Sequence, residues 1–394
     1  MELRRCKKAF ILGLFCITAT GRCNPQLPHL QQAHQPVLET PFSSTLIIPV
    51  AIKGKTYHFI VDTGASLTVI DNKLAKEITR PLAADEIPQH HREAFTDVTT
   101  VTGLLDKKHY SLFKPVPFFI GSEEIGDNEI WIAADTTLFT QSLGVNIDGF
   151  IGIDTFRQLN WQVDNQAKRL IVTKEAPTTR SWQRCTGYED SYNRSPQLWF
   201  SLGTDDIAFR IDTGADRTYV GQKFIDYATS QQGTLMPDNK RSRNGDMGGA
   251  YHTPLYILKG LTFNNLPLGE LKVTGNNNEL YAVGMDFLSR FSRYAFMPSR
   301  MMFCYDVSTL ERSGLASQRS LSVRYNGQFI ELYYNSDDDL KGTGLLNGDS
   351  VIRINGTAYP PAQINEVRNL LEMTPPGKLT LSILRGDKRH EIHL

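Results

Sequence analysis

TLIIPVAIKGKTYHFIVDTG, residues 45–64, contains an apolar strand, a Lys-Gly-Lys turn and a second strand that ends on Asp62-Thr63-Gly64. LWFSLGTDDIAFRIDTG, residues 198–214, repeats this order and ends on Asp212-Thr213-Gly214. Apolar, strand-forming runs on both sides of a glycine-containing turn are typical of β-hairpins. The repeat predicts two related β-rich lobes, each of which presents one aspartate where a strand ends.

Each copy is followed by a second shared segment. DGFIGIDTF occupies residues 148–156 and YAVGMDFL occupies residues 281–288, and each contains apolar residues, a glycine, an aspartate and an aromatic residue. After the first of these segments the sequence predicts a short helix and a closing β-hairpin. The aspartate-to-glycine separation is 90 residues in the first copy (62 to 152) and 72 in the second (212 to 284), which indicates an insertion in the first lobe.

Two carboxylates that share one proton can hydrolyse a peptide bond without a metal ion or a covalent intermediate. One takes a proton from water while the other gives a proton to the carbonyl oxygen, because like charges about 3 Å apart cannot both ionise. We therefore expect Asp62 and Asp212 to be brought face to face by the two lobes. The turn residues expected to support them, through tight turns and hydrogen bonds across the lobe interface, are Thr63, Gly64, Thr213 and Gly214.

Both halves resemble retropepsin-like aspartic proteases of bacterial exported proteins, and their pairing resembles the bilobal pepsin arrangement. The resemblance covers roughly residues 38–306. It implies a mostly β fold with two pseudo-symmetric β-barrel lobes, catalytic aspartates at Asp62 and Asp212, and supporting glycines at Gly152 and Gly284. It also implies a glycine-rich flap over the substrate. Residues 243–252 and 96–108 are the candidates for the two lobes, although either segment could be an ordinary surface loop.

The C-terminal segment carries a different pattern. GLLNGDSVIRING, residues 344–356, resembles the signature of PDZ domains in bacterial exported proteases. Apolar residues at helical spacing near 364–371 predict one helix, and a strand pair is expected around LTLSILRG. The resemblance implies a PDZ-like α+β domain at 320–394 that binds an extended peptide as an added strand. Its deletion is then expected to impair cleavage of long substrates more than of short peptides.

The N-terminus has the pattern of a signal peptide. Four basic residues within the first eight precede an apolar run over 9–19 that is too short to span a membrane. We therefore expect an exported protein, periplasmic or secreted, with membrane attachment only if it is lipid-anchored at Cys23. The predicted divisions are a signal peptide at 1–21, the first lobe at 38–173, a linker at 174–197, the second lobe at 198–306, a linker at 307–319 and the PDZ-like domain at 320–394.

Composition and missing motifs limit the classes of function that the sequence supports. The 42 Lys and Arg residues balance 42 Asp and Glu residues, so no strongly basic face for nucleic acid is expected. The sequence has no CxxC, HExxH or Cys/His cluster, so we expect neither a metal nor another cofactor, and we interpret the adjacent His90 and His91 as a polar loop. Cys185 and Cys304 could pair, or could both remain thiols.

The combined prediction is an aspartic endopeptidase that acts on peptide or protein substrates through an active site within one monomer. A catalytically inactive peptide-binding or scaffold protein is the alternative. Ala65 and Ala215 follow the two Asp-Thr-Gly turns, where pepsin-like enzymes of acidic compartments commonly carry a hydroxyl that lowers the aspartate pKa. Without that donor, the dyad is expected to keep its proton to higher pH, with a bell-shaped optimum at roughly pH 5–6.

Overall fold

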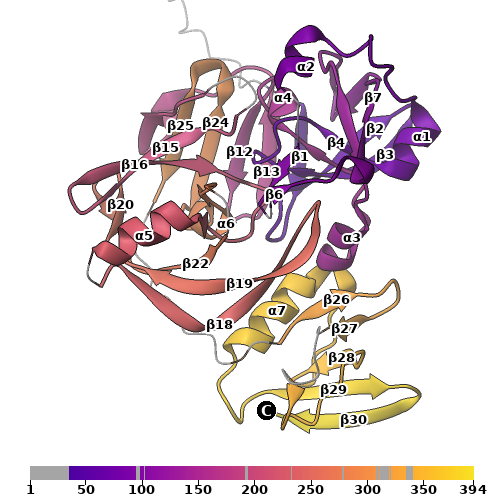
Figure 1. Cartoon of the computed structure of the whole chain (residues 1–394), viewed down its shortest axis with the longest axis vertical. Helices are drawn as coiled ribbons and strands as arrows, with labels where there is room; N and C mark the ends of the chain where they lie inside the picture. Colours follow the sequence, from indigo (N-terminus) through magenta and orange to yellow (C-terminus); the bar gives the residue numbers. More distant parts are fainter. Residues whose placement is uncertain are drawn as a thin grey trace, which may run out of the picture. The chain divides into compact units, whose positions relative to one another are not determined.

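The computed structural model describes residues 35–94, 98–101, 103–190, 194–231, 233–276, 279–307, 310, 319, 321–333 and 340–394, without the side chains of 93–94 and 239–242. The predicted signal peptide and Cys23 therefore lie outside the described residues. Strands dominate, in three large sheets and a smaller one near the C-terminus (Figure 1). The expectation of a mostly β protein with two β-rich lobes and a further unit is confirmed.

The first lobe is built on an eight-stranded sheet in the order β7-β10-β4-β11-β3-β2-β8-β9. Its two longest strands, β2 (Ile47–Ile52) and β3 (Lys55–Val61), form the predicted hairpin. The other strands are β4 (Val69–Asp71), β7 (Tyr110–Phe113), β8 (Phe118–Ile120), β9 (Glu123–Ile125), β10 (Trp131–Ala134) and β11 (Gly149–Ile151). A separate pair, β5 (Thr99–Thr100) and β6 (Gly103–Leu104), follows helices α1 (Asn72–Ile78) and α2 (Gln89–Ala94), and α3 (Thr137–Leu143) and α4 (Ile153–Phe156) come later.

The second lobe is built on a nine-stranded sheet in the order β18-β19-β22-β17-β23-β16-β15-β20-β21. The predicted hairpin is β15 (Gln197–Leu202) with β16 (Asp205–Ile211). The longest hairpin pairs β18 (Leu235–Asp246) with β19 (Gly249–Leu258). The remaining elements are β17 (Tyr219–Val220), α5 (Gln222–Ser230), β20 (Leu261–Phe263), β21 (Leu266–Pro267), β22 (Leu271–Gly275), β23 (Ala282–Val283) and α6 (Met285–Leu288).

The same strand crossings occur in both lobes. In the first, β11 runs parallel to β3 and antiparallel to β4, and β10 runs parallel to β4. In the second, β23 runs parallel to β16 and antiparallel to β17, and β22 runs parallel to β17. The sequence repeat therefore corresponds to a repeated topology, in which each Asp-Thr-Gly turn follows the strand paired with the glycine-bearing segment.

A six-stranded sheet joins the lobes, in the order β1-β13-β12-β24-β25-β14. Its strands are β1 (Leu38–Pro41), β12 (Asn160–Asp164), β13 (Arg169–Thr173), β14 (Arg184–Gly187), β24 (Arg293–Met297) and β25 (Met302–Asp306). The predicted hairpin after the first glycine segment is β12 with β13, whereas the short helix, α4, lies within residues 148–156 and not after them. Residues 174–197, the expected linker, include β14, and Cys185 on that strand forms a disulfide with Cys304 on β25. One hydrophobic core runs through both lobes and this sheet.

The C-terminal unit, residues 321–394, has a hydrophobic core of its own. It contains a five-stranded sheet in the order β26-β27-β28-β29-β30 and one long helix, α7 (Ile364–Met373). The strands are β26 (Val323–Tyr325), β27 (Ile330–Leu332), β28 (Ser350–Ile354), β29 (Thr380–Arg385) and β30 (Lys388–His393). Ile364, Val367 and Leu371 of α7 face this core, at the spacing that predicted the helix. Within the described part of the chain, no helix is long and apolar enough to cross a membrane.

Candidate active site

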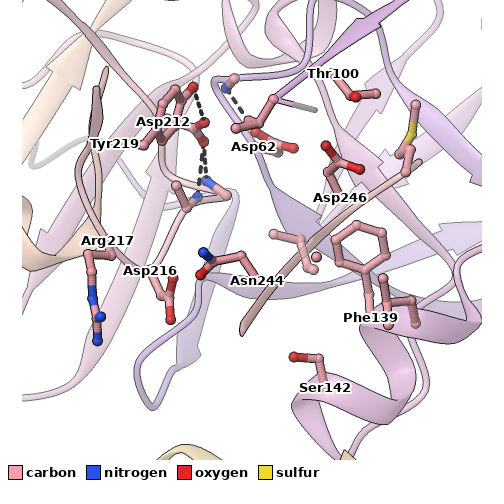
Figure 2. Close-up of a pocket in the computed structure, with 18 of the residues that line it drawn as sticks. Asp62, Thr100, Phe139, Ser142, Asp212, Asp216, Arg217, Tyr219, Asn244 and Asp246 are labelled. Atoms are coloured by element: carbon pink, nitrogen blue, oxygen red, sulfur yellow. Dashed lines mark hydrogen bonds between the residues drawn. The ribbon is translucent and has the colours of Figure 1, made fainter. Parts of the chain in front are cut away.

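The two Asp-Thr-Gly turns meet at the centre of the two lobes. The backbone N–H of Asp62 donates to the carbonyl oxygen of Ile151 (3.0 Å), and that of Asp212 donates to the carbonyl oxygen of Val283 (3.0 Å). Each aspartate is thereby fixed to a strand of its own lobe, Asp62 to β11 and Asp212 to β23. These strands directly precede Gly152 and Gly284. Figure 2 shows the carboxylates of Asp62 and Asp212 at the same end of the pocket.

The two threonines connect the turns through buried, reciprocal hydrogen bonds. The backbone N–H of Thr63 donates to Oγ1 of Thr213, and the backbone N–H of Thr213 donates to Oγ1 of Thr63, each over 3.0 Å. Each hydroxyl in turn donates over 2.7 Å to a carbonyl oxygen of the opposite lobe, Ile211 or Val61. Both threonines are at most 1% exposed. These four bonds fix the lobes against one another at the position of the aspartates.

The glycines of the turns allow the carboxylates to approach. A Cβ atom on Gly64 would lie 2.5 Å from Oδ2 of Asp212, and one on Gly214 would lie 2.5 Å from Cγ of Asp62. Because real Cβ atoms do not approach other atoms within 3.0 Å, any larger residue would displace the opposite carboxylate. The two glycines thus keep the space between the aspartates open.

Gly152 and Gly284 lie behind the turns, as the resemblance implies. A Cβ on Gly152 would lie 2.3 Å from the carbonyl carbon and oxygen of Leu67, and one on Gly284 would lie 2.7 Å from the carbonyl oxygen of Ala215. Both approaches involve rigid backbone. These glycines therefore let the segments after β11 and β23 pack directly against the loops that carry the aspartates.

The electrostatic environment distinguishes the two carboxyl groups. Burial raises the pKa of Asp62 well above its usual range, and the charge of Asp212 raises it further. Burial also raises the pKa of Asp212, but the hydroxyl of Tyr219 and the backbone N–H groups of Ala215 and Gly214 stabilise its ionised form and oppose this rise. The arrangement therefore favours a proton on Asp62 and a negative charge on Asp212.

Tyr219 is the residue of this site that the sequence analysis missed. Its hydroxyl donates to Oδ2 of Asp212 over 3.0 Å, and its ring is 8% exposed. Ala65 and Ala215 cannot donate from a side chain, as the sequence analysis stated, but the expected pH optimum took no account of the Tyr219 hydroxyl that reaches Asp212. The residue seven positions after Asp62 is Val69, so the corresponding position of the first lobe carries no hydroxyl.

We expect Tyr219→Phe to shift the acidic limb of the kcat/KM profile to higher pH. Loss of the hydroxyl removes a stabiliser of the charged form, so the pKa of Asp212 rises and fewer molecules carry the ionised base at low pH. Tyr227→Phe is the matched control, because its hydroxyl donates to Asp205 (2.6 Å), away from the dyad. An acidic limb that stays in place, or moves to lower pH, would contradict this role of Tyr219.

Two further carboxyl groups are buried behind the dyad. Asp154 on α4 accepts from the hydroxyl of Thr68 (2.8 Å), and Asp286 on α6 accepts from the hydroxyl and N–H of Thr218 (each 2.9 Å). Burial raises the pKa of each from 3.8 to about 6. Such a group favours folding fully below the unfolded pKa of 3.8 and loses this contribution as the pH rises through about 6.

Asp286→Asn is therefore expected to gain stability relative to the wild type as the pH rises from 4 to 7. The wild type loses roughly 2 kcal/mol from this carboxyl over that range, because most of the effect of a pKa change from 3.8 to about 6 falls within it, whereas an amide does not titrate. Urea unfolding at several pH values measures the difference. Asp85→Asn, at an exposed position, is the control. A difference between Asp286→Asn and the wild type that is constant with pH would contradict the assignment.

One cleft of about 910 Å³ contains both aspartates. The tip of the β18–β19 hairpin contributes residues 243–247 and 250–251, and the β5–β6 region contributes residues 98–101, so both predicted flap segments reach the cleft. In Figure 2, Asp246 is drawn next to Asp62, on the side away from Asp212, and Phe139 and Ser142 on α3 lie at the far end of the pocket. The described part of 243–252 belongs to a strand pair and its turn, which contradicts an ordinary loop.

The C-terminal unit also lines this cleft. Its lining residues are Leu321, Ser322, Val323, Arg324, Tyr333, Asn365, Arg368 and Glu372. Arg368 on α7 donates to the carbonyl oxygen of Val323 (3.0 Å) and to the hydroxyl of Ser142 on α3 (3.4 Å). Arg243, on the hairpin, donates to the carbonyl oxygen of Tyr333 (3.3 Å), and its guanidinium lies 3.7 Å from the centre of that ring. The unit thus contacts both lobes at the cleft.

Comparison with known proteins agrees with this geometry for the first lobe. A family model described as an aspartyl protease matches residues 48–155, which contain the first Asp-Thr-Gly turn and Gly152. No curated protein matches the chain. The second lobe lies outside the matched residues. Its similarity to the first lobe rests on the second Asp-Thr-Gly turn and on the strand pairing that the two lobes share.

Proposed function

We propose that this chain is an aspartic endopeptidase whose catalytic dyad is Asp62 and Asp212. The observation that carries the proposal is the convergence of two Asp-Thr-Gly turns in one chain, connected by the reciprocal bonds of Thr63 and Thr213. The family match over residues 48–155 supports the same class of activity. Because both turns belong to one chain, the proposed active site is complete in a monomer.

In the proposed mechanism, ionised Asp212 is the base and protonated Asp62 is the acid. Asp212 takes a proton from a water held between the carboxyl groups, and the water oxygen bonds to the carbonyl carbon of the substrate. Asp62 gives its proton to the carbonyl oxygen, which forms a neutral tetrahedral intermediate. The proton on Asp212 then passes to the leaving nitrogen as the C–N bond breaks, and Asp62 recovers a proton from the intermediate.

An extended peptide is the substrate that we propose for the cleft. The β18–β19 hairpin and the β5–β6 region border it, so a peptide would lie beneath them across the two aspartates. Apolar side chains near the far end, including Leu138, Phe139 and Leu143 of α3, would accept apolar side chains of the substrate. Arg324 and Arg368 add positive charge at the same end.

We propose that the C-terminal unit, for which the sequence suggests a PDZ-like fold, helps to form the substrate cleft. It lines the same cavity as the dyad and contacts both the hairpin and α3, which supports a role at the scissile region. This location changes the expectation of a remote module that recruits only long substrates.

Deletion of 320–394 is accordingly expected to lower kcat/KM by roughly tenfold or more for short peptides as well as long ones. The deletion removes one wall of the cleft, and poor positioning of a bound substrate costs rate regardless of substrate length. The separate core of this unit allows the lobes to keep their own packing, which cooperative thermal unfolding of the truncated protein would check. Unchanged cleavage of short peptides would favour the remote-recruitment role instead.

We also propose that the protein acts outside the cytoplasm, in a periplasmic or secreted location. The Cys185–Cys304 disulfide supports an oxidising compartment, where such bonds persist. The signal-peptide pattern at 1–21 is in keeping with export. Membrane attachment through a lipid at Cys23 remains the alternative form of the exported protein.

Incubation of the purified protein with an unstructured protein substrate tests the proposed activity. We expect internal cleavage that a statine-type inhibitor blocks and that a metal chelator does not. Binding of the substrate without any cleavage, from about pH 3 to pH 7, would instead support the catalytically inactive peptide-binding protein.

A further inference from the structure

His90, His91 and Glu129 place three metal-ligand groups at one point of the first lobe. Nε2 of His90 and Nε2 of His91 each lie 2.8 Å from the same oxygen, Oε2 of Glu129. The three ligand atoms lie within 4.8 Å of one another. We propose that these residues bind a divalent transition-metal ion, with Zn²⁺ the ion that best suits two imidazoles and one carboxylate.

The distances suit an ion after a small adjustment. Zinc binds histidine nitrogen and carboxylate oxygen at about 2.0–2.2 Å, so in a tetrahedral site its ligand atoms lie roughly 3.3–3.6 Å apart. The two N···O distances of 2.8 Å are shorter than this, so each imidazole nitrogen and the carboxylate oxygen need to separate by roughly 0.5–0.8 Å. For this to occur, each neutral imidazole must carry its proton on Nδ1, which leaves the Nε2 lone pair for the ion.

The fold brings the three groups together from two segments. The sequence analysis interpreted His90 and His91 as a polar loop, which is wrong, because both lie at the start of helix α2. Their ring centroids are 4.3 Å apart. Glu129 lies just before β10, and the residues that follow it, Ile130 and Trp131, are at most 1% exposed. The carboxylate is therefore attached to a rigid part of the lobe.

The exposed fractions of the three side chains place the proposed ion at the protein surface, with His91 on its buried side. The His91 side chain is 2% exposed, whereas those of His90 and Glu129 are 49% and 47% exposed. Three protein ligands would hold the ion, and water would complete its coordination. Metal can enter such a site from solvent without unfolding of the lobe.

The location suggests what the ion would do. Helix α2 ends at Ala94, and residues 98–101, which are among those that line the cleft, begin four positions later. An ion that links α2 to Glu129 would fix the start of this cleft-bordering segment to the body of the first lobe. The proposed site is separate from the aspartate dyad, so its occupancy does not depend on the proposed peptidase activity.

Titration of the full chain, without an affinity tag and after treatment with a chelator, tests the site. We expect one Zn²⁺ per chain by calorimetry, a Co²⁺ complex with visible absorption, and a Tm increase of roughly 5 °C at 100 times the Kd. His90→Gln and Glu129→Gln, both at exposed positions, are expected to weaken binding by about 10-fold or more, whereas His109→Gln, at an exposed position outside the cluster, should bind as the wild type does.

Absence of saturable binding by the wild type would overturn the proposal. Binding that His90→Gln and Glu129→Gln leave unchanged would also overturn it, because the ion would then bind elsewhere. Far-ultraviolet circular dichroism of each variant establishes that reduced binding is not caused by unfolding. Since the readouts are metal content and Tm, the result is independent of whether the protein cleaves peptides.

Discussion

Asp62→Asn and Asp212→Asn are each expected to lower kcat by at least roughly 10³-fold, with little loss of stability. Either change leaves one carboxyl group for two proton transfers. The fold tolerates the amides, because Oδ1 of each residue, which accepts the backbone N–H groups of its own turn, remains an oxygen. For Asp212→Asn, removal of the buried negative charge also offsets part of any lost hydrogen bonding.

Initial rates of peptide cleavage, together with urea unfolding, measure both halves of this expectation. Asp85→Asn is the control, because Asp85 is an exposed carboxyl group that does not line the cleft. We expect this control to keep its activity to within a small factor. Substantial activity in either dyad variant would show that the two turns do not act as one site.

Gly64→Ala is expected to lower kcat/KM by roughly 10²-fold or more while the lobes remain folded. The added Cβ would lie 2.5 Å from Oδ2 and 2.6 Å from Cγ of Asp212, so that carboxylate must move. It would leave the position fixed by the hydroxyl of Tyr219 and the N–H groups of Gly214 and Ala215. A displacement of about 1 Å at a reacting group is enough for this loss.

Gly126→Ala controls for the general effect of a glycine substitution. Gly126 has no positive φ, and its added Cβ would meet no atom within 4 Å. We expect it to retain the activity and the Tm of the wild type. If Gly64→Ala were as active as Gly126→Ala, the close approach of the two turns would have no part in the reaction.

The features that the sequence predicted are those that repeat in it. Both hairpins, both turns and both glycine segments could be found because each has a partner elsewhere in the chain, and the structure gives the partners the same strand crossings. The aspartates follow from this repeat. Once two such turns must face one another, few other residues can occupy the space between them.

Tyr219 could not be predicted in the same way, because its role breaks the repeat. The corresponding residue of the first lobe is Val69, and both suit a buried strand equally well. Only the three-dimensional arrangement shows that the phenol reaches Oδ2 of Asp212. A comparison of the two repeats position by position would have identified this difference, although not its consequence.

The contribution of the C-terminal unit and the pairing of Cys185 with Cys304 depend on long-range contacts. Arg368 contacts Ser142 across 226 positions, and the two cysteines are 119 positions apart. Neither local propensity nor hydrophobic periodicity reports on such pairs. The position of His90 and His91 on a helix was missed because a six-residue helix has too few turns for a clear periodic pattern.

Active-site titration with a tight-binding statine-type inhibitor tests the central claim most directly. The measurement is the number of inhibitor molecules that abolish activity per chain, combined with the mass of the enzyme by light scattering. We expect one inhibitor per chain at the mass of a monomer, because Asp62 and Asp212 of the same chain form the site. One inhibitor per two chains, with activity confined to a dimer, would contradict it.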